Sequence, residues 1–373
     1  MRILLYEWSC SGGLRGPSAA AVVGEDGILP GDGPFQVAAA TVPVEGRAML
    51  EALLADGVRR QGWKLAVLVD RSLSIDVPAG VQQIDVDGAT EIEALVRAAS
   101  SADWTVIVAP ETAGVLGARV AAVREVGGRV AAPSAGFIAT AADKQATVLA
   151  LAAAGVPVPA GRVLQAFEVL PEGFYLPAVS KARGGVGCDG VTILRGARDF
   201  KPDDHDRRLE AFVPGVPVGV SLLCGPEGHL LLPPVQQEFT PGDRPRYLGG
   251  VVRPHPSWSH RAVALAQRAV AALEGPSSSA PAAHRALGWV GVDMILGSAD
   301  DGGADRVLEV NPRLTTSFVG LSRLTRESLL GAMLDCCDGR SVCQSPGLMF
   351  SAGAAFAGRG SQRGGWSFRA DGW

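Results

Sequence analysis

The sequence contains little charge and few aromatic residues. Charged residues make up 19% of the 373, aromatic residues 6%, and the formal net charge is -4. Proteins that bind nucleic acid or anionic membranes concentrate lysine and arginine on one surface, and a weakly acidic chain of this kind lacks that excess. We therefore expect neither nucleic acid nor a membrane among its partners.

Long hydrophobic runs and cysteine pairs are also lacking. Apolar stretches such as 146–158 contain glycine and proline and fall short of the ~20 residues that span a membrane. The apolar run in the opening "MRILLYEW" is too short for a secretory signal. The six cysteines form no CxxC pair and none has a histidine at zinc spacing, so free thiols in a reducing compartment are expected. We expect a cytoplasmic protein.

Residues 1–132 alternate short apolar runs with helical patterns. "ILLY", "KLAVLVD" and "WTVIVAP" have the composition of buried strands, and apolar residues recur at helical spacing over 49–61 and 91–99. This alternation predicts a parallel sheet with helices on its faces, and ligands bind such sheets at the carboxyl ends of the strands. The Gly-, Pro- and Ala-rich segment 14–40 is predicted to be a long loop over that edge, a candidate lid.

The pattern changes after residue 133. A helix is expected in "TAADKQATVLALAAAGVPVP", with Thr140 or Asp143 as its N-cap. Strand-like segments follow, among them "WVGVDMIL" and "RVLEV", which a polar Gly/Asp turn joins. The last helical pattern ends near Asp335, and the Gly-, Ala- and Ser-rich remainder is expected to be poorly ordered.

The segment "SKARGGVGCDGVTIL" contains a GxGxxG pattern at Gly185, Gly187 and Gly190. A dinucleotide-binding turn of this pattern must open a helix, but "VTIL" is strand-like, so the glycines are predicted to join two strands as in the flap over ATP in kinases. Lys181 precedes the loop and is placed to meet the same phosphates. A mobile hairpin with a solvated lysine explains the loop alone equally well. No GxxxxGK[ST] occurs, which excludes a P-loop NTPase.

Acidic residues interrupt two of the apolar strands. Glu309 and Asn311 are two positions apart and share one face of their strand, and Asp293 lies in the strand before it. A buried carboxylate must be paired, protonated or bound to a cation. If the strands lie antiparallel, three oxygen donors meet, and such donors select Mg²⁺ or Mn²⁺. Arg313 can contact the same anions. Structural salt bridges are the alternative, which the combination of these residues disfavours.

Taken in order, these motifs resemble those of ATP-grasp enzymes over about residues 133 to 335. They are Asp143-Lys144, Ser180-Lys181 with "ARGGVGCDG", "LEAFVPG" at 209–215, "GVDMIL" and "LEVNPR". The resemblance implies a parallel α/β pre-ATP-grasp domain at 1–132 and a two-lobed α+β ATP-grasp domain at 133–338. The small lobe would cover about 162–212, and 339–373 would be a poorly ordered tail.

The resemblance also assigns roles, as expectations. The residues expected around ATP are Lys144, Lys181, Gly184, Gly185, Gly187, Glu210, Ala211, Phe212 and Val213, the last four forming the hinge that reads adenine. The expected ligands of two Mg²⁺ ions are Asp293, Glu309 and Asn311. Arg313 and Lys181 would act on the transferring phosphoryl group. The sequence departs from the family pattern at Pro217, where many members have an acid for the ribose, and at Ser180 and Ala182, which flank Lys181.

The implied reaction joins a small carboxylate to a small amine. Oxide is a poor leaving group, so ATP first converts the carboxylate to an acyl phosphate, and cations offset the charge on the moving phosphoryl group. The amine then attacks, giving an amide, ADP and phosphate, while the closed flap keeps water away from the intermediate.

A narrower similarity is to the archaeal-type tyramine–glutamate ligases of methanofuran synthesis. It rests on "LLYEWSCSGG", "VAPETAG", "VNPRLTTSFVGL" and "QQEF…RYLGGVVRP", and implies glutamate as the acid and an aromatic amine as the nucleophile. The substrate candidates are Glu7, Ser9, Gly12, Gly13, Tyr247, Gly249, Gly250 and Arg253. Glu7 would bind a substrate ammonium or cap the next helix, and Arg253 would hold a substrate carboxylate or lie on the surface.

Other functions remain open at this point. One is a ligase that makes another dipeptide-like product. A second is a regulatory protein that binds ATP without turnover, which the Pro217 departure favours. A third is a generic NAD-binding protein. A homodimer is compatible with the sequence.

Overall fold

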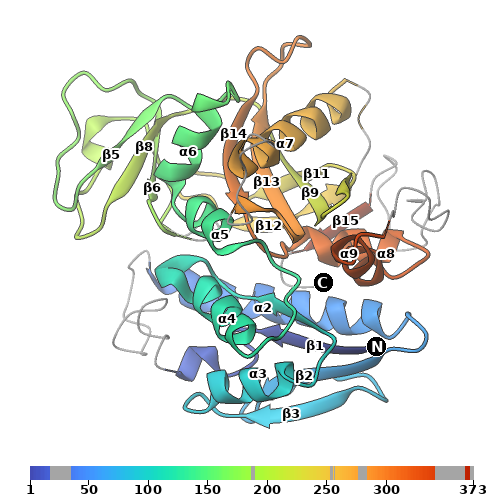
Figure 1. The fold of residues 1–373 in the computed structure, drawn as a ribbon. Coiled ribbons are helices and arrows are strands. Elements are labelled where there is room, and N and C mark those ends of the chain that lie inside the picture. Colours follow the sequence, from blue (N-terminus) through green and yellow to red (C-terminus); the bar gives the residue numbers. More distant parts are fainter. Residues whose placement is uncertain are drawn as a thin grey trace.

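The computed structural model describes residues 1–16, 35–185, 190–252, 255, 257–275, 284–340 and 366–369. Figure 1 shows two stacked parts, a parallel sheet with its helices and a larger part built around antiparallel strands. Helix α2 (Phe35–Gly57) lies between them and contacts β1 on one side and α8 and α9 on the other. This arrangement confirms the predicted fold class.

The N-terminal sheet is parallel, with strand order β3-β2-β1-β4. Its strands are β1 (Arg2–Glu7), β2 (Lys64–Asp70), β3 (Gln82–Val86) and β4 (Trp104–Val108). Alternate residues of β1 face opposite cores: Ile3 and Leu5 pack with α2, whereas Leu4 and Tyr6 pack with α3 (Glu91–Ala99) and α4 (Val115–Glu125). The sheet is therefore buried on both faces, as its continuous apolar strands predict.

Helix α2 corrects the expectation of a long loop over 14–40. Gly13–Arg15 form a short 3-10 helix, α2 begins at Phe35, and 17–34 lie outside the described residues. Pro43 and Gly46 within α2 weaken its helical pattern in the sequence. Gly46 is required by packing, because a Cβ there would lie 2.4 Å from Glu7 Oε1.

The larger sheet has the order β14-β13-β9-β11-β12-β15, with β10 paired to β9. Its strands are β9 (Val216–Gly225), β10 (Gly228–Leu231), β11 (Val235–Phe239), β12 (Tyr247–Val252), β13 (Gly288–Leu296), β14 (Arg306–Asn311) and β15 (Trp366–Arg369). One face packs on α5 (Ala135–Ala142), α6 (Lys144–Ala153) and α7 (Ser259–Glu274). The other shares a core with α2, α8 (Ser317–Leu324) and α9 (Leu329–Cys337), so one hydrophobic core joins the two parts of the molecule.

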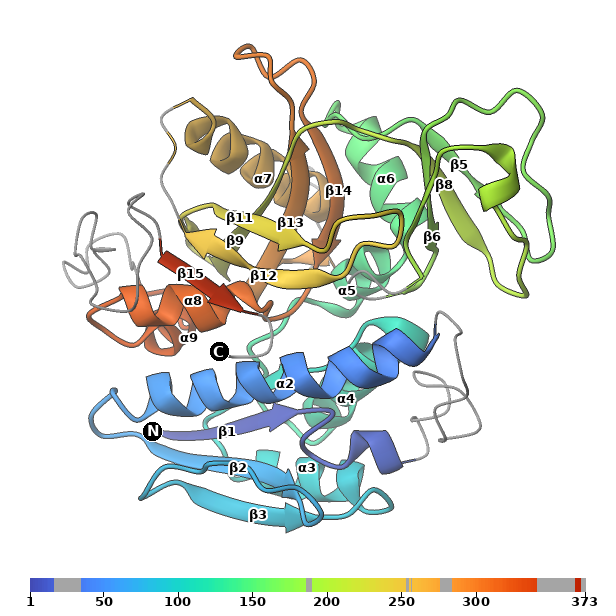
Figure 2. The same cartoon turned by 180° about the vertical axis from the view of Figure 1, so that it is seen from behind.

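A second antiparallel sheet stands apart from these, with the order β5-β8-β6-β7 (Figure 2). It consists of β5 (Gly161–Leu164), β6 (Ala178–Ala182), β7 (Thr192–Leu194) and β8 (Arg207–Ala211), and a short 3-10 helix, Ala197–Asp199, lies between β7 and β8. Another short 3-10 helix, Thr112–Gly114, follows β4. The sheet has its own small core, which includes Leu164, Ala178 and Leu209. It occupies the segment where the small lobe is expected.

Strand β15 corrects the expectation of a poorly ordered tail at four residues. It pairs antiparallel with β12, and Phe368 opposite Gly250 is buried. Apart from Gly339 and Arg340, the rest of 339–373 lies outside the described residues. Phe368 packs on an apolar surface that forms only when the larger sheet has folded. The short-range pattern of the sequence therefore could not predict this strand.

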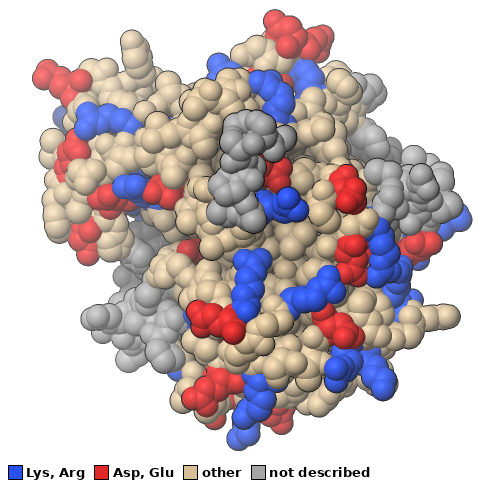
Figure 3. All heavy atoms as spheres, in the orientation of Figure 1, with Lys and Arg blue, Asp and Glu red and all other residues tan. Residues whose placement is uncertain are grey.

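The described part of the chain contains no helix long and apolar enough to cross a membrane. On the face seen in Figure 3, acidic and basic side chains are interspersed rather than gathered by sign.

Candidate active site

A cavity of about 480 Å³ lies where the small sheet faces the larger one. Residues of β6, β7 and β8 form one wall and residues of β9, β11, β13 and β14 the other. Of the expected site residues it is lined by Lys181, Glu210, Ala211, Phe212, Val213, Tyr247, Asp293, Glu309, Asn311 and Arg313. Motifs spread over more than a hundred positions of the sequence therefore meet around one space.

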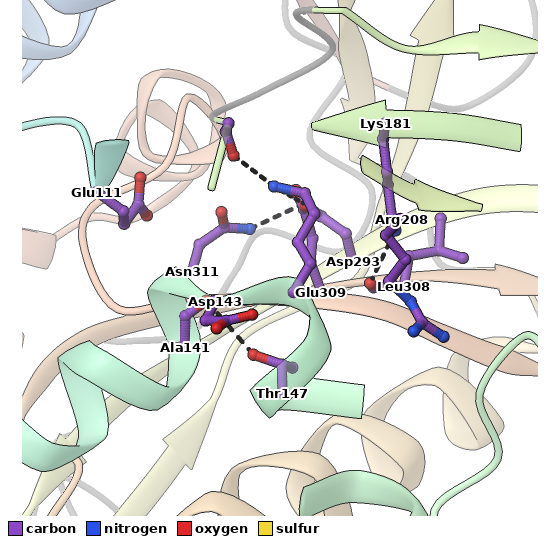
Figure 4. Close-up of polar contacts among 12 residues, drawn as sticks. Glu111, Ala141, Asp143, Thr147, Lys181, Arg208, Asp293, Leu308, Glu309 and Asn311 are labelled. Carbon is purple, nitrogen blue, oxygen red and sulfur yellow. Dashed lines mark hydrogen bonds and ion pairs between the residues drawn. The ribbon is translucent and has the colours of Figure 1, made fainter. Parts of the chain in front are cut away.

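The three expected metal ligands meet on paired strands. Asp293 of β13 is directly opposite Glu309 of β14. Asn311 donates from Nδ2 to Asp293 Oδ2 at 2.9 Å, as Figure 4 shows, and Gln237 donates to Oδ1 at 2.8 Å. Burial and the neighbouring Glu309 raise the pKa of Asp293 to about 7. Two carboxylates held this close carry a charge that a cation would neutralise, and their oxygens with the free amide oxygen of Asn311 fit Mg²⁺ or Mn²⁺.

The described residues contain no cluster of three His, Cys, Asp or Glu side chains that could hold a metal. A cation at Asp293 and Glu309 would therefore depend on Asn311 and on oxygen atoms from outside the protein. Such a site suits an ion that keeps several waters or phosphate oxygens.

Both expected phosphate-binding lysines point toward this wall. Lys144, the first residue of α6, lies 3.6 Å from Glu309 Oε2 and donates to the Gly185 carbonyl. Lys181 of β6 lies 2.8 Å from Glu210 and donates to the Leu308 carbonyl at 3.3 Å (Figure 4). Burial alone would raise the pKa of Glu309, but Lys144, Lys181 and Arg313 together lower it. The carboxylate is therefore kept ionised and able to bind a cation.

The glycine segment lies between β6 and β7, two antiparallel strands. It opens no helix, so the dinucleotide-binding interpretation is not supported. Gly184 and Gly185 are described, whereas Gly187 lies outside the described residues.

The base of this segment is tied to α6. Asp143 accepts from the backbone amides of Gln145 and Ala146, which confirms it as the N-cap. The Asp143 carboxylate also binds Arg183 at 2.7 Å. Arg183 was not predicted from the sequence, since its partner lies forty positions away. The same turn that presents Lys144 thus also holds the start of the glycine loop.

The expected hinge residues end β8 and line the cavity. Glu210 is buried, and it accepts from Arg208 Nε at 2.6 Å as well as pairing with Lys181. Pro217, the position that departs from the family pattern, also lines the cavity. Together with Phe212 and Val213, Pro217 makes the wall near the hinge mostly apolar, which suits the planar ring of a nucleotide base.

Arg313 follows β14 and lines the cavity. Its Nε lies 2.9 Å from Oε1 of Glu111, which follows β4 in the other part of the molecule. Coulombic attraction from Glu111, Glu45 and Glu309 raises the pKa of Arg313 against the opposing effect of its burial. Neither Glu45 nor Glu111 was predicted from the sequence. The signal for Glu111 was its place in "VAPETAG", after the carboxyl end of a parallel strand.

The substrate candidates near β1 do not line this cavity. Glu7 is buried, and its Oε2 accepts from Ser9 Oγ at 2.6 Å and from the Cys10 amide at 2.8 Å. Gly12 has a φ of 96°, and a Cβ at Gly13 would lie 2.1 Å from Trp8 Nε1. These contacts give Glu7 a local capping role and give the glycines a packing role.

The remaining substrate candidates divide. Tyr247 lines the cavity, and its ring centroid lies 5.7 Å from that of Phe239. Gly250 is not among the residues that line it. A Cβ at Gly250 would lie 2.6 Å from Val235 and 3.3 Å from the Phe368 ring. At Gly249 a Cβ would lie 2.1 Å from the Phe368 carbonyl oxygen, so both glycines admit β15. Arg253 lies outside the described residues.

Comparison with solved structures gives the same architecture. An ATP-grasp superfamily protein from Archaeoglobus fulgidus is 22% identical with a TM-score of 0.60, covering 91% of this chain and 88% of that one. The ADP complex of N5-carboxyaminoimidazole synthetase from Staphylococcus aureus is 13% identical with a TM-score of 0.59, covering 91% and 78%. The L-amino acid ligase from Bacillus licheniformis is 14% identical with a TM-score of 0.60, covering 90% and 73%. At these identities the likeness establishes the fold.

Comparison with family models identifies the two parts. A search of curated proteins found no match. Residues 141–317 match the model of the ATP-grasp domain, and residues 63–136 match that of the pre ATP-grasp 3 domain. The chain thus contains a pre-ATP-grasp domain followed by an ATP-grasp domain, and these two matched domains are those of the ATP-grasp superfamily.

Proposed function

We propose that this protein is an ATP-dependent ligase that joins a carboxylate to an amine through an acyl phosphate and releases ADP and phosphate. The observation that carries the proposal is the convergence of Lys144 and Lys181 on the carboxylate wall of Asp293 and Glu309. The arrangement combines cations for phosphate oxygens with a carboxylate pair for a divalent ion. The named activities of similar folds, an L-amino acid ligase among them, are compatible with it.

In this proposal ATP lies between the two sheets. The apolar hinge of Ala211 to Val213 would hold the base, and Lys144, Lys181 and the amides of Gly184 and Gly185 would hold the phosphates. Asp293, Glu309 and Asn311 would hold Mg²⁺, which would supply Lewis-acid stabilisation of charge on the phosphate oxygens. Pro217 lines the wall where many relatives have an acid, so the ribose would be held by shape rather than by a carboxylate.

The protein's own cations guide the transfer. Arg313 lines the cavity beside Glu309 and offers its guanidinium to the moving phosphoryl group or to the acyl phosphate. Lys181 stabilises the same charge from the opposite wall.

We propose glutamate as the acid and tyramine or a similar aromatic amine as the nucleophile. The support is the sequence similarity to tyramine–glutamate ligases, together with Phe239 and Tyr247 on the cavity wall. The aromatic ring of such an amine would pack against these two side chains. Small-molecule substrates and a cytoplasmic location are part of the same proposal.

Product analysis tests the proposal. The purified protein is incubated with ATP, Mg²⁺, glutamate and tyramine, and in parallel with panels of amino acids and amines, and products are identified by mass spectrometry. We expect an amide with equal amounts of ADP and phosphate, and no product from Glu309→Gln. Release of AMP and pyrophosphate would contradict the acyl-phosphate route.

Pro217 favours a second candidate, a regulatory protein that binds ATP without turnover. That function predicts thermal stabilisation by Mg-ATP with no ADP formed under any pair in the panel. The ligase proposal predicts both stabilisation and turnover.

A further inference from the structure

Glu45 brings the pre-ATP-grasp domain into the ATP cavity. Among the described residues that line the cavity, it is the only one that precedes Pro159. It lies on α2, next to Gly46, whose missing side chain lets the helix approach Glu7 and Ser9 closely. The close packing of Gly46 fixes the position of α2, and α2 in turn holds the Glu45 carboxylate at the cavity wall.

Glu45 shares its positively charged neighbour with two other carboxylates. Arg313, in the segment after β14, also lines the cavity and is the charged side chain that lowers the pKa of Glu45 against the effect of burial. The same guanidinium also interacts with Glu111 from the end of β4 and with Glu309 from β14. One arginine thus serves three carboxylates, while Glu7 beneath α2 is occupied by Ser9 and Cys10.

Glu111 is a second carboxylate that depends on the same arginine. Its side chain is 6% exposed, and neither carboxylate oxygen forms a hydrogen bond with a described residue, although Oε1 lies 2.9 Å from Arg313 Nε. Buried carboxylate oxygens normally accept hydrogen bonds. Glu111 itself is not among the described residues that line the cavity, so Glu45 is the carboxylate of the N-terminal domain that a cation in the cavity can reach.

An amine substrate carries cationic N–H donors and must lose one of these protons before it can react. An alkyl amine has a pKa near about 10, so at neutral pH it is an ammonium ion without a free electron pair. It must give up a proton before it can attack an acyl phosphate. The departing phosphate becomes a proton acceptor only after the amine has attacked, so this first proton needs another acceptor.

We propose that Glu45 is the general base that binds the substrate ammonium and takes its proton. This role rests on the ligase function proposed above. The proton passes to the Glu45 carboxylate, and the nitrogen electron pair forms a C–N bond to the acyl carbon. The C–O bond to phosphate breaks, and phosphate leaves with that electron pair. The second nitrogen proton goes to the departing phosphate, and Glu45 returns its proton to solvent.

The protonation behaviour of Glu45 agrees with this role. Burial raises its pKa to about 7, with Arg313 opposing the rise. A base with a pKa near the working pH combines a sufficient ionised fraction with sufficient basicity. Above this pH the carboxylate is ionised and ready to accept a proton, and below it the carboxyl is occupied.

Hydroxylamine separates acid activation from amine deprotonation. It is largely uncharged at neutral pH and traps acyl phosphates as hydroxamates without needing a base. Wild type and Glu45→Gln are supplied with Mg-ATP and a panel of amino acids as carboxylates. The nucleophile is hydroxylamine in one series and tyramine or the amino acids themselves in the other. We expect Glu45→Gln to form hydroxamate at close to the wild-type rate but to lose about 10²-fold or more in kcat/KM for the amine.

The pH profile gives a second readout. Wild-type kcat/KM for the amine should fall below about pH 7, as Glu45 takes up a proton. For Glu45→Gln it should instead rise steadily toward the pKa of the amine, because the variant can use only free amine. Glu45→Asp should recover part of the rate. Glu51→Gln removes an acid of the same helix that pairs with Arg47 and is not among the cavity-lining residues, and should match wild type.

The two proposals can fail separately. If Glu45→Gln forms amide at the wild-type rate with a wild-type pH profile, Glu45 is not the base although the ligase function stands. A wild-type enzyme that transfers the acyl group only to hydroxylamine also overturns the role of Glu45. If wild type forms no hydroxamate with any acid, the ligase proposal fails and the role of Glu45 fails with it. Equal melting temperatures of wild type and Glu45→Gln show that loss of amide is not loss of fold.

Discussion

Arg313 and Glu111 form a buried ion pair between the two domains. Arg313 Nε lies 2.9 Å from Glu111 Oε1, and the two side chains are 14% and 6% exposed. The arginine follows the strand that carries Glu309 and Asn311, and the glutamate follows the last strand of the parallel sheet. The position of the proposed catalytic arginine is therefore set partly by the pre-ATP-grasp domain.

Glu111→Gln should destabilise the protein and impair catalysis. Removing one partner of a buried pair leaves an uncompensated charge, which typically costs about 3–5 kcal/mol, and Glu45 and Glu309 offset part of this loss. We expect the free energy of unfolding to fall by about 2–4 kcal/mol in denaturant titrations and kcat to fall more than the KM for ATP rises. Glu125→Gln, at an exposed site on α4, should change stability by less than about 0.5 kcal/mol. Equal stability of the two variants would contradict the role of the pair.

Asp293→Asn should raise the stability of the nucleotide-free protein while abolishing its response to Mg-ATP. Burial and the neighbouring Glu309 raise the pKa of Asp293 to about 7, and each tenfold change in proton affinity corresponds to about 1.4 kcal/mol. Removing that charge should stabilise by on the order of 1 kcal/mol or more, since Gln237 and Asn311 can rotate their amides to suit the new side chain. Thermal melts with and without Mg-ATP measure both effects. A variant that is less stable without ligand and still stabilised by Mg-ATP would show that Asp293 is a structural acid.

The meeting of Asp293, Glu309 and Asn311 could be predicted from the sequence because its geometry is local. Side-chain alternation puts Glu309 and Asn311 on one face, and a short polar turn returns β14 antiparallel to β13. The parallel sheet of the N-terminal part was predicted from short-range periodicity, whereas the ATP-grasp architecture was implied by the resemblance of the ordered motifs to that family.

Contacts between distant segments could not be predicted in this way. Glu45 and Glu111 reach the site through the packing of α2 and the end of β4 against the ATP-grasp domain, and no local pattern encodes that docking. The same limit applies to the packing of Gly13 and Gly250. Trp8 and Phe368, which require those glycines, become visible only once the chain is folded.

Substitutions at Asp143 should separate helix capping from attachment of the glycine loop. Asparagine still caps α6 but loses the ion pair with Arg183, whereas alanine loses both. Asp143→Asn should weaken ATP binding several-fold with little loss of stability, because the pair is about one-third exposed and worth little to folding. Asp143→Ala should lose about 1 kcal/mol more. Isothermal titration with ATP and thermal melts give the two quantities. Unchanged ATP affinity in Asp143→Asn would indicate that the ion pair with Arg183 plays no part in nucleotide binding.

Asp56 at the end of α2 should be a main determinant of docking between the domains. Its Oδ2 accepts from Ser328 Oγ and from the Leu330 amide, both at 2.8 Å, so it caps α9 from the other domain. Arg59, which pairs with Asp56, donates to the Ser322 carbonyl at 2.9 Å. Hydrogen bonds to a charged group contribute about 1.5–3 kcal/mol each, so Asp56→Ala should lose roughly 2–5 kcal/mol of unfolding free energy.

Asp56→Asn should lose less, and the difference should depend on pH. Burial raises the pKa of Asp56, with the bonds from Leu330 and Ser328 opposing the rise. The folded chain therefore binds a proton more readily than the unfolded chain, so the stability that this group contributes declines as pH rises from about 4. Wild type should exceed Asp56→Asn most at low pH. Denaturant titrations at several pH values measure the trend, and a gap that widens as pH rises would mean that the ionised carboxylate is the favoured form.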